Sequence, residues 1–449
     1  MKKILTGLLG FSCLLFYPAL HAQQDSETVI DFKQALELAI AHDLDLQAAE
    51  YEYQSVLETR AQSMAALLPQ INFSVFYNRT DNTVANSDQP GFIPDRTITI
   101  NTDGFDLTLS QSIYNHSFYK TLEQTDMRIA AATASVEAAR QDLIIRLATA
   151  YFNVLGAQDN LKFASAEKEA IGKQLEQSKK RFEVGLIAIT DVKESQASYD
   201  TAVAQEIDAE NLLAAQFEAL AVILGTYTRH IAPLREDFPL SIPAPADIRQ
   251  WTENALQNNL NLKAARFNFK AAQKQVDADR AGHYPSVDLV AKHSFSSPDN
   301  SPFVTYETTN TAVTVQLNVP IYSGGLTSAR LRQSVALQEQ ARALKEKAER
   351  QTLQQARDTY LGVTSTIAQV QALKQALLST QSAHESTQAG FEVGTRTAID
   401  VLTTLREVYR AERDYARARY NYVINTLRLK QAAGTLTIED GNMLNNFLQ

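Results

Sequence analysis

The residue types that most often carry catalysis or bind metals are scattered through this chain. It contains seven histidines, of which no two have metal-ligand spacing on one helix: His21, His42, His116, His230, His283, His293 and His384. The sequence shows no Walker loop, dinucleotide fingerprint or nucleophile elbow. Ser323-Gly324-Gly325 resembles a phosphate loop only superficially, because a turn before a helix accounts for it. We therefore predict no metal, no cofactor and no enzymatic activity.

A different group of polar residues lies beside two glycines that interrupt long helical segments. Gly185 and Gly394 suit the left-handed position that ends a helix. Both breaks then show a threonine placed to cap the next helix and an aspartate near its positive end: Thr190 with Asp191, and Thr397 with Asp400. Each break is therefore predicted to be the tip of a helical hairpin.

The segments around these breaks form one unit that is written twice. Residues 39–46 match 255–262 and 68–69 match 284–285 at an offset of 216, and 113–114 match 321–322 at an offset of 208. An offset of 209 relates 182–185 to 391–394 and 224–226 to 433–435. A period this long indicates two structural halves rather than a repeat array.

The boundaries follow from this duplication. We assign residues 23–230 to the first repeat, 231–247 to a proline-rich linker, 248–434 to the second repeat and 435–449 to a tail. The linker and the tail are expected to lie against the outside of the helices rather than in a core. Each half reads as a helix, two strands, a very long helix and a second helix, the first helix of the chain running from about 31 to 68.

The strands and the long helices together suggest a tube. The predicted strands, at about 70–80, 104–113, 286–296 and 311–320, alternate apolar and polar residues as the wall of a membrane barrel does. Four strands cannot close a barrel, whereas three copies would give twelve strands, so the strand count favours a trimer. The long helices, about 116–183 and 325–391, would each reach about 100 Å, and shorter helices follow at about 190–225 and 397–433.

The N-terminus and the charge narrow the class of protein further. Lys2 and Lys3 precede a short apolar run, so residues 1–22 are predicted to be a signal peptide. This segment contains Cys13, the only cysteine, and its surroundings fit a lipoprotein signal poorly. The formal charge of -9 argues against nucleic acid as a partner. No apolar window is long enough for a spanning helix, so a membrane crossing would have to use strands.

The two tip motifs, at 182–192 and 391–402, resemble those of the TolC family of outer-membrane efflux proteins, as do 318–325 and 418–422. The resemblance covers nearly the whole mature chain. It implies a homotrimer with a twelve-stranded β-barrel in the lipid of the outer membrane and a long α-helical barrel across the periplasm. It also implies a periplasmic adaptor protein and an inner-membrane transporter of the RND, ABC or MFS class as partners.

By the same resemblance, the family's gate falls on Thr190, Asp191, Arg396 and Asp400. Asp191 and Arg396 would join the inner and outer helix pairs and hold the tube shut. Asp400, repeated three times around the axis, would form an acidic constriction. The alternative reading treats these residues as helix caps and nothing more.

The sequence departs from the family type at two gate positions. Phe391 replaces a tyrosine, which removes a hydrogen bond, and Thr403 replaces an aspartate, which removes one ring of charge. The function that follows is a passive export duct of a tripartite efflux pump or a type I secretion system, gated at its tips. The competing interpretation is a periplasmic coiled-coil adaptor or structural stalk, which would share the hairpins but form no trimeric barrel.

Overall fold

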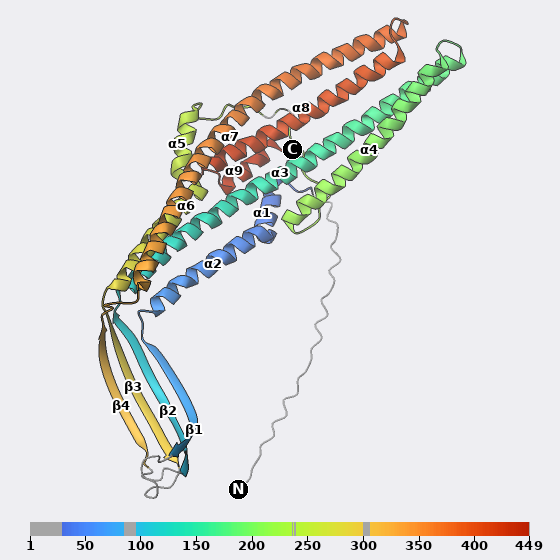
Figure 1. Cartoon of the computed structure of the whole chain (residues 1–449). Helices are drawn as coiled ribbons and strands as arrows, with labels where there is room; N and C mark the ends of the chain where they lie inside the picture. The colour runs from blue at the N-terminus through green and yellow to red at the C-terminus, as the bar shows by residue number, and fades with distance from the viewer. Residues whose placement is uncertain (1–28, 85–95, 236, 238, 300–305, 449) are drawn as a thin grey trace, which may run out of the picture.

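The computed structural model describes residues 29–84, 96–235, 237, 239–299 and 306–448. The predicted signal peptide with Cys13, and Glu236 and Phe238 in the predicted linker, lie outside the described residues. A four-stranded sheet forms one end of an elongated molecule, and the tips of two long helical hairpins form the other end (Figure 1).

The two halves repeat the same order of elements. The first half consists of α1 (Phe32–His42), α2 (Leu44–Ala65), β1 (Gln70–Val84), β2 (Arg96–Tyr114), α3 (His116–Glu183) and α4 (Ile189–Leu224). The second consists of α5 (Ile248–Asn258), α6 (Leu260–Arg280), η1 (Ala281–His283), β3 (Ser286–Asp299), β4 (Thr308–Asn318), α7 (Leu326–Glu392) and α8 (Ala398–Ala432), followed by α9 (Ile438–Met443) and η2 (Leu444–Phe447). The predicted mainly α fold with a small β part and a duplicated unit is confirmed.

The first helix of each half is broken, contrary to the continuous helix expected from about 31 to 68. Asp43 has an extended backbone, and its buried carboxylate accepts a hydrogen bond from the Leu46 amide at 2.8 Å. It thereby ends α1 and caps α2. Asn259 does the same between α5 and α6, accepting from the Leu262 amide at 3.0 Å. Hydrophobic periodicity does not reveal this break, because a single capping residue replaces one helical position.

The sheet is antiparallel with the order β1-β2-β3-β4, so β1 and β4 are its edges. The first two strands extend beyond their predicted ends, since β2 begins at Arg96 rather than near 104. Cross-strand side-chain bonds support this extension, among them Thr99 Oγ1 to Asp81 Oδ1 at 2.6 Å. β4 ends before Pro320, which has no amide hydrogen to donate. Alternation marked only the apolar part of each strand, whereas backbone pairing continues beyond it.

One face of the sheet is apolar and open to its surroundings. Val75 is 72% exposed and Leu317 is 64% exposed, and Phe105 on the same face stacks against Phe295 with ring centroids 5.7 Å apart. The opposite face is polar and carries an ion pair between Lys292 Nζ and Asp106 Oδ1 at 3.1 Å. One apolar face and one polar face suit a wall between lipid and water.

None of the helices in the described part of the chain is both long enough and apolar enough to span a membrane.

The segment predicted to be a linker contributes to the main core, which was not expected. Ile231 and Leu234 are only 6% exposed and belong to the same hydrophobic cluster as Phe32. Tyr151 is fully buried there, and its hydroxyl donates to the Ala232 carbonyl oxygen at 2.9 Å. Leu234 also forms a β-bridge with Leu448 in the tail. The prolines of this segment disfavour helices and strands, but they do not prevent burial of its apolar residues.

Gly434 is expected to tolerate alanine much less well than Gly185 does. Both have positive φ, 69° and 78°, so alanine costs each about 1 kcal/mol of backbone strain. A Cβ at Gly434 would also lie 2.3 Å from the backbone oxygen of Asn258, whereas a Cβ at Gly185 meets nothing within 4 Å. We therefore expect Gly434→Ala to cost about 3 kcal/mol in total. Thermal unfolding at one scan rate compares the variants, and equal transition temperatures would contradict this account.

Candidate functional site

The two hairpin tips at the end opposite the sheet form the candidate site. At the first tip, the amides of Gly185 and Leu186 donate to the carbonyl oxygens of Phe182 and Arg181, each at 2.9 Å. At the second tip, the amides of Gly394 and Thr395 donate to those of Phe391 and Gly390 at 3.2 and 2.9 Å. Both are Schellman motifs, so both long helices end in the same geometry. The predicted turn positions of Gly185 and Gly394 agree with this observation.

The helices that leave the two tips are capped differently. Thr397 caps α8 as predicted, since its hydroxyl oxygen accepts from the Asp400 amide at 3.2 Å and the Asp400 carboxylate accepts from the Thr397 amide at 2.9 Å. Thr190 does not cap α4, because the cap position is Ala188, which makes no side-chain bond. Thr190 therefore lies inside the first turn, and the carboxylate of Asp191 lies near the positive helix end.

Arg396 and Asp191 lie on different hairpins. No ion pair between them, or from either to another described residue, is formed within the single chain. The Arg396 side chain is exposed, and its stem lies over Gly390, where a Cβ would be 2.7 Å from Arg396 Cγ. The sequence did not single out Gly390, yet its lack of a side chain makes room for the predicted gate arginine.

A contact that the sequence did not indicate joins the two tips. The Arg181 guanidinium, at the end of α3, lies 4.2 Å from the centre of the Phe391 ring, at the end of α7. Phe391 is 3% exposed and packs with Ala398 and Val401. A cation above an aromatic ring is stabilised by about 0.5–2 kcal/mol. The phenylalanine that was expected only to lose a hydrogen bond therefore makes another contact between the hairpins.

Arg181→Ala is expected to loosen the second tip, because the cation above Phe391 is lost. Opening of the amides in the first turn of α8 should increase several-fold, corresponding to about 1 kcal/mol. Hydrogen exchange of a peptide covering this turn measures the change, and Arg181→Lys, which retains a cation, is the matched control. Unchanged protection in the alanine variant would show that the contact does not stabilise the tip.

Between the tips and the core, a buried ion pair holds the two hairpins together. Glu167 of α3 is 3% exposed, and its Oε2 lies 3.2 Å from Arg413 Nη1 of α8. Arg406 of α8 lies 3.9 Å from the other carboxylate oxygen of Glu167. Closer to the tips, Ile171, Ala202 and other apolar residues form a small cluster that joins α3, α4 and α8. The two hairpins are thus joined at several points along their length, and the contact between Arg181 and Phe391 links them at the tips.

The charge of Asp400 is stabilised by its surroundings. Hydrogen bonds from the backbone and the hydroxyl of Thr397 lower the pKa of this carboxyl below its usual value, and the nearby Arg396 adds to the effect. Asp400 is therefore ionised at neutral pH and contributes negative charge at the tip. Within the described residues, no three His, Cys, Asp or Glu side chains lie close enough together to hold a metal ion.

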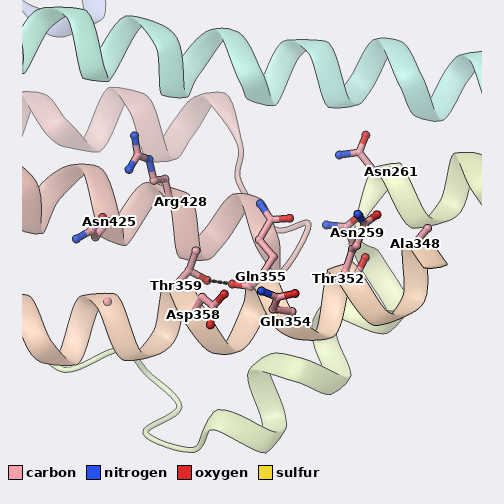
Figure 2. Close-up of a pocket in the computed structure, with 12 residues that line it drawn as sticks. Asn259, Asn261, Ala348, Thr352, Gln354, Gln355, Asp358, Thr359, Asn425 and Arg428 are labelled. Atoms are coloured by element: carbon pink, nitrogen blue, oxygen red, sulfur yellow. Dashed lines mark hydrogen bonds between the residues drawn. The ribbon is translucent and has the colours of Figure 1, made fainter. Parts of the chain in front are cut away.

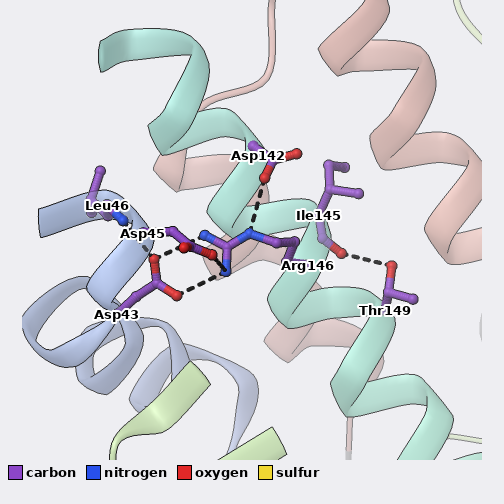
Figure 3. Close-up of polar contacts among 7 residues, drawn as sticks. All are labelled: Asp43, Asp45, Leu46, Asp142, Ile145, Arg146 and Thr149. Atoms are coloured by element: carbon purple, nitrogen blue, oxygen red, sulfur yellow. Dashed lines mark hydrogen bonds and ion pairs between the residues drawn. The ribbon is translucent and has the colours of Figure 1, made fainter. Parts of the chain in front are cut away.

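The helix break of each half forms a second polar site, which the duplication relates. In the first half, Arg146 donates to both carboxylate oxygens of Asp43, at 2.8 and 2.9 Å, and to Asp142 at 2.9 Å (Figure 3). The corresponding residues of the second half are the uncharged Asn259, Gln351 and Gln355, which line an open pocket of about 510 Å³ (Figure 2). The helix break is thus surrounded by charged side chains in the first half and by side-chain amides in the second.

Comparison with known proteins decides which family this architecture represents. A sequence model described as outer membrane efflux protein matches residues 35–226 and 251–435. This chain belongs to the outer membrane efflux protein family. The outer membrane protein TolC of Vibrio cholerae is 35% identical over 98% of this chain and 97% of its own length. AprF of Pseudomonas aeruginosa, an alkaline protease secretion protein, is 30% identical over 98% of this chain and 90% of its own.

A solved structure of CusC shows the same fold, with a TM-score of 0.77 and 19% identity, covering 90% of this chain and 92% of CusC. Membership of the efflux protein family makes the chain an export channel of the outer membrane with a long periplasmic helical part. The family consists of channels rather than enzymes. The competing interpretation as a periplasmic adaptor is not favoured, because the relatives are outer-membrane channels.

Proposed function

We propose that three copies of this chain form one passive duct that is closed at the helical tips. The observation that carries this proposal is the separation of two features along the molecule. An apolar sheet with two unpaired edges lies at one end, and two matched hairpin tips lie at the other. Edges of this kind are not tolerated in lipid, so the β1 edge of one copy pairs with the β4 edge of the next.

In the closed duct, Asp191 and Arg396 attract one another between hairpins, and Thr190 lies in the same first turn as Asp191. Asp400 supplies a ring of three carboxylates that favours cations in the constriction. The lowered pKa of Asp400 supports this role, because the ring then remains charged at neutral pH. Opening separates the tips and shifts an existing equilibrium between closed and open states.

The partners of the duct supply the energy for export. A periplasmic adaptor docks on the tips, and an inner-membrane transporter of the RND, ABC or MFS class delivers the substrate. The relatives support two kinds of export machine for this duct. TolC of Vibrio cholerae is an outer membrane protein, and AprF is named for the secretion of a protease. This chain accordingly serves a tripartite efflux pump or a type I secretion system, after its signal peptide has been removed.

Membrane fractionation followed by native mass spectrometry in detergent tests the assembly. We expect the protein in the outer-membrane fraction with the mass of three mature chains and no bound cofactor. A soluble periplasmic protein with the mass of one chain would contradict the proposal and favour an adaptor or stalk.

A further inference from the structure

The duplication relates contacts inside one chain to contacts between chains. The helices next to the sheet lie in the order α2, α3, α6, α7, because α2 contacts α3, α3 contacts α6, and α6 contacts α7. The α3–α6 contact joins the two halves of the chain. Helices α2 and α7 are the outer edges, as are the strands β1 and β4 next to them (Figure 1). The repeat counterpart of the α3–α6 contact is therefore a contact between α7 and the α2 of another copy.

An ion pair within the chain shows how the two halves preserve a contact. In the first half, Arg140 of α3 lies 3.0 Å from Glu50 of α2. In the second half, the counterpart of Arg140 is Glu349 of α7 (offset 209), and the counterpart of Glu50 is Arg266 of α6 (offset 216). These two residues form an ion pair at 3.6 Å. The same contact is thus made twice, with the two charges exchanged.

The contact between the halves has a similar ion pair. Lys274 Nζ of α6 lies 2.7 Å from Glu123 Oε2 of α3. By the same offsets, the counterpart of Lys274 is Glu58 of α2, and the counterpart of Glu123 is Arg332 of α7. These two residues have opposite charges, again exchanged between the halves. Both are exposed, and neither forms an ion pair with any other described residue of the chain.

The residues that follow Glu123 and Arg332 in the sequence differ in burial between the two halves. Gln124 is 4% exposed where α3 meets α6, and its side-chain amide donates to Gln275 Oε1 at 2.8 Å. Its counterpart on α7, Gln333, is also a glutamine but is exposed. The same residue type is therefore buried where α3 meets α6 and exposed at the equivalent position of α7.

We propose that Glu58 forms an ion pair with Arg332 of the partner subunit, and that this α2–α7 surface binds a second copy of the chain. The proposal rests on the three-copy duct described above, and it specifies the register in which the copies meet. Helices α2 and α7 then repeat the α3–α6 packing, which gives the duct a nearly regular ring of helices.

The duplication also relates the β2–β3 pairing inside the chain to the two sheet edges. Leu109 pairs with Ala291 and Leu107 with His293 where β2 meets β3. The counterparts of the β2 residues lie on β4 (offset 208), and those of the β3 residues lie on β1 (offset 216). The equivalent pairs between β4 and the β1 of the partner subunit are therefore Leu317 with Val75 and Val315 with Tyr77. All four of these residues are more than 60% exposed in the single chain and belong to the apolar face. Pairing in this register would continue that face without a break.

Cross-linking with paired cysteines tests the contact. Cys13 is the only cysteine of the chain, so Glu58→Cys with Arg332→Cys adds the two reactive thiols of the mature protein. A short bismaleimide added to the detergent-solubilised protein is expected to produce covalent dimers and trimers. Lys274→Cys with Glu123→Cys is the matched control within one chain, and it should gain only the mass of the reagent and form no covalent dimer or trimer. Glu58→Cys with Glu339→Cys lies about 10 Å out of register and should give much less product.

Charge reversal tests whether the contact is an ion pair. Glu58→Arg and Arg332→Glu should each lower the temperature at which the trimer dissociates in detergent, and the double variant should regain most of the loss. A trimer by native mass that gives no cross-linked product from the Glu58/Arg332 pair would overturn this inference but leave the duct intact. A single-chain mass would overturn the proposed assembly as well.

Discussion

Arg146→Gln is expected to destabilise the protein by about 3 kcal/mol, because it leaves a buried carboxylate without its cation. Asp43 is buried, and Arg146 provides two hydrogen bonds to its carboxylate. Glutamine cannot replace them, so a buried charge would remain without a cation. The Arg146 side chain is 28% exposed, which places the cost near the lower limit for a buried ion pair.

The second half of the chain supplies the matched control for this variant. Asn259 and Gln355 hold the same positions without charge, and Asn259 still caps its helix. Asp43→Asn combined with Arg146→Gln should therefore recover most of the lost stability, because asparagine caps helices about as well as aspartate. Thermal unfolding of the three proteins at one scan rate measures this. A double variant as unstable as the single one would refute the explanation.

The ion pair between Asp43 and Arg146 also makes the stability of the protein depend on pH. The hydrogen bonds from Arg146 lower the pKa of Asp43, although burial opposes the shift. A carboxyl whose pKa is lowered by folding contributes stability above its unfolded pKa of about 4, and this stability is lost as the pH falls below that value. Wild type should therefore lose its advantage over the Asp43→Asn/Arg146→Gln variant below about pH 4. An advantage that persists at pH 2 would be inconsistent with this linkage.

Arg396→Ser is expected to make the closed duct leak. The arginine is the proposed cationic partner of Asp191 between the hairpins, and its loss removes the attraction that holds the tips together. Uptake of a hydrophilic fluorescent dye by cells that produce the variant should rise several-fold over wild type, and Asp191→Ala should have a similar effect.

Arg410→Ser is the control for the Arg396 variant. Arg410 of α8 is exposed, as Arg396 is, but it pairs with Glu407 on its own helix, about 20 Å from the tip. Its loss should leave dye uptake unchanged. Equal uptake in the Arg396 and Arg410 variants would mean that Arg396 does not contribute to closure.

Sequence reasoning was sufficient where a feature repeats or is local. The long helices follow from proline-free segments, and the tip turns follow from the glycine-threonine pattern. The internal repeat identifies the two halves of the chain. Local rules failed at the first helix, because the Asp43 and Asn259 caps replace single helical positions. They also misjudged the 231–247 segment, whose apolar residues are buried by partners distant in sequence.

The contacts that link the hairpins could not be read from the sequence. Glu167 and Arg413 are 246 residues apart, and their pairing depends on the packing of α3 against α8. Arg181 carried no signal of its own, because a lysine or arginine near the end of a helix is explained by the helix dipole alone. Only the three-dimensional structure shows that its guanidinium lies over Phe391.

The most direct test of a duct gated at its tips is single-channel conductance in a planar bilayer, with wild type beside Arg396→Ser. We predict a small, cation-selective conductance for wild type and a several-fold larger one for the variant. Equal conductances would contradict a gate at Arg396, and the absence of any conductance from the purified trimer would contradict the duct itself.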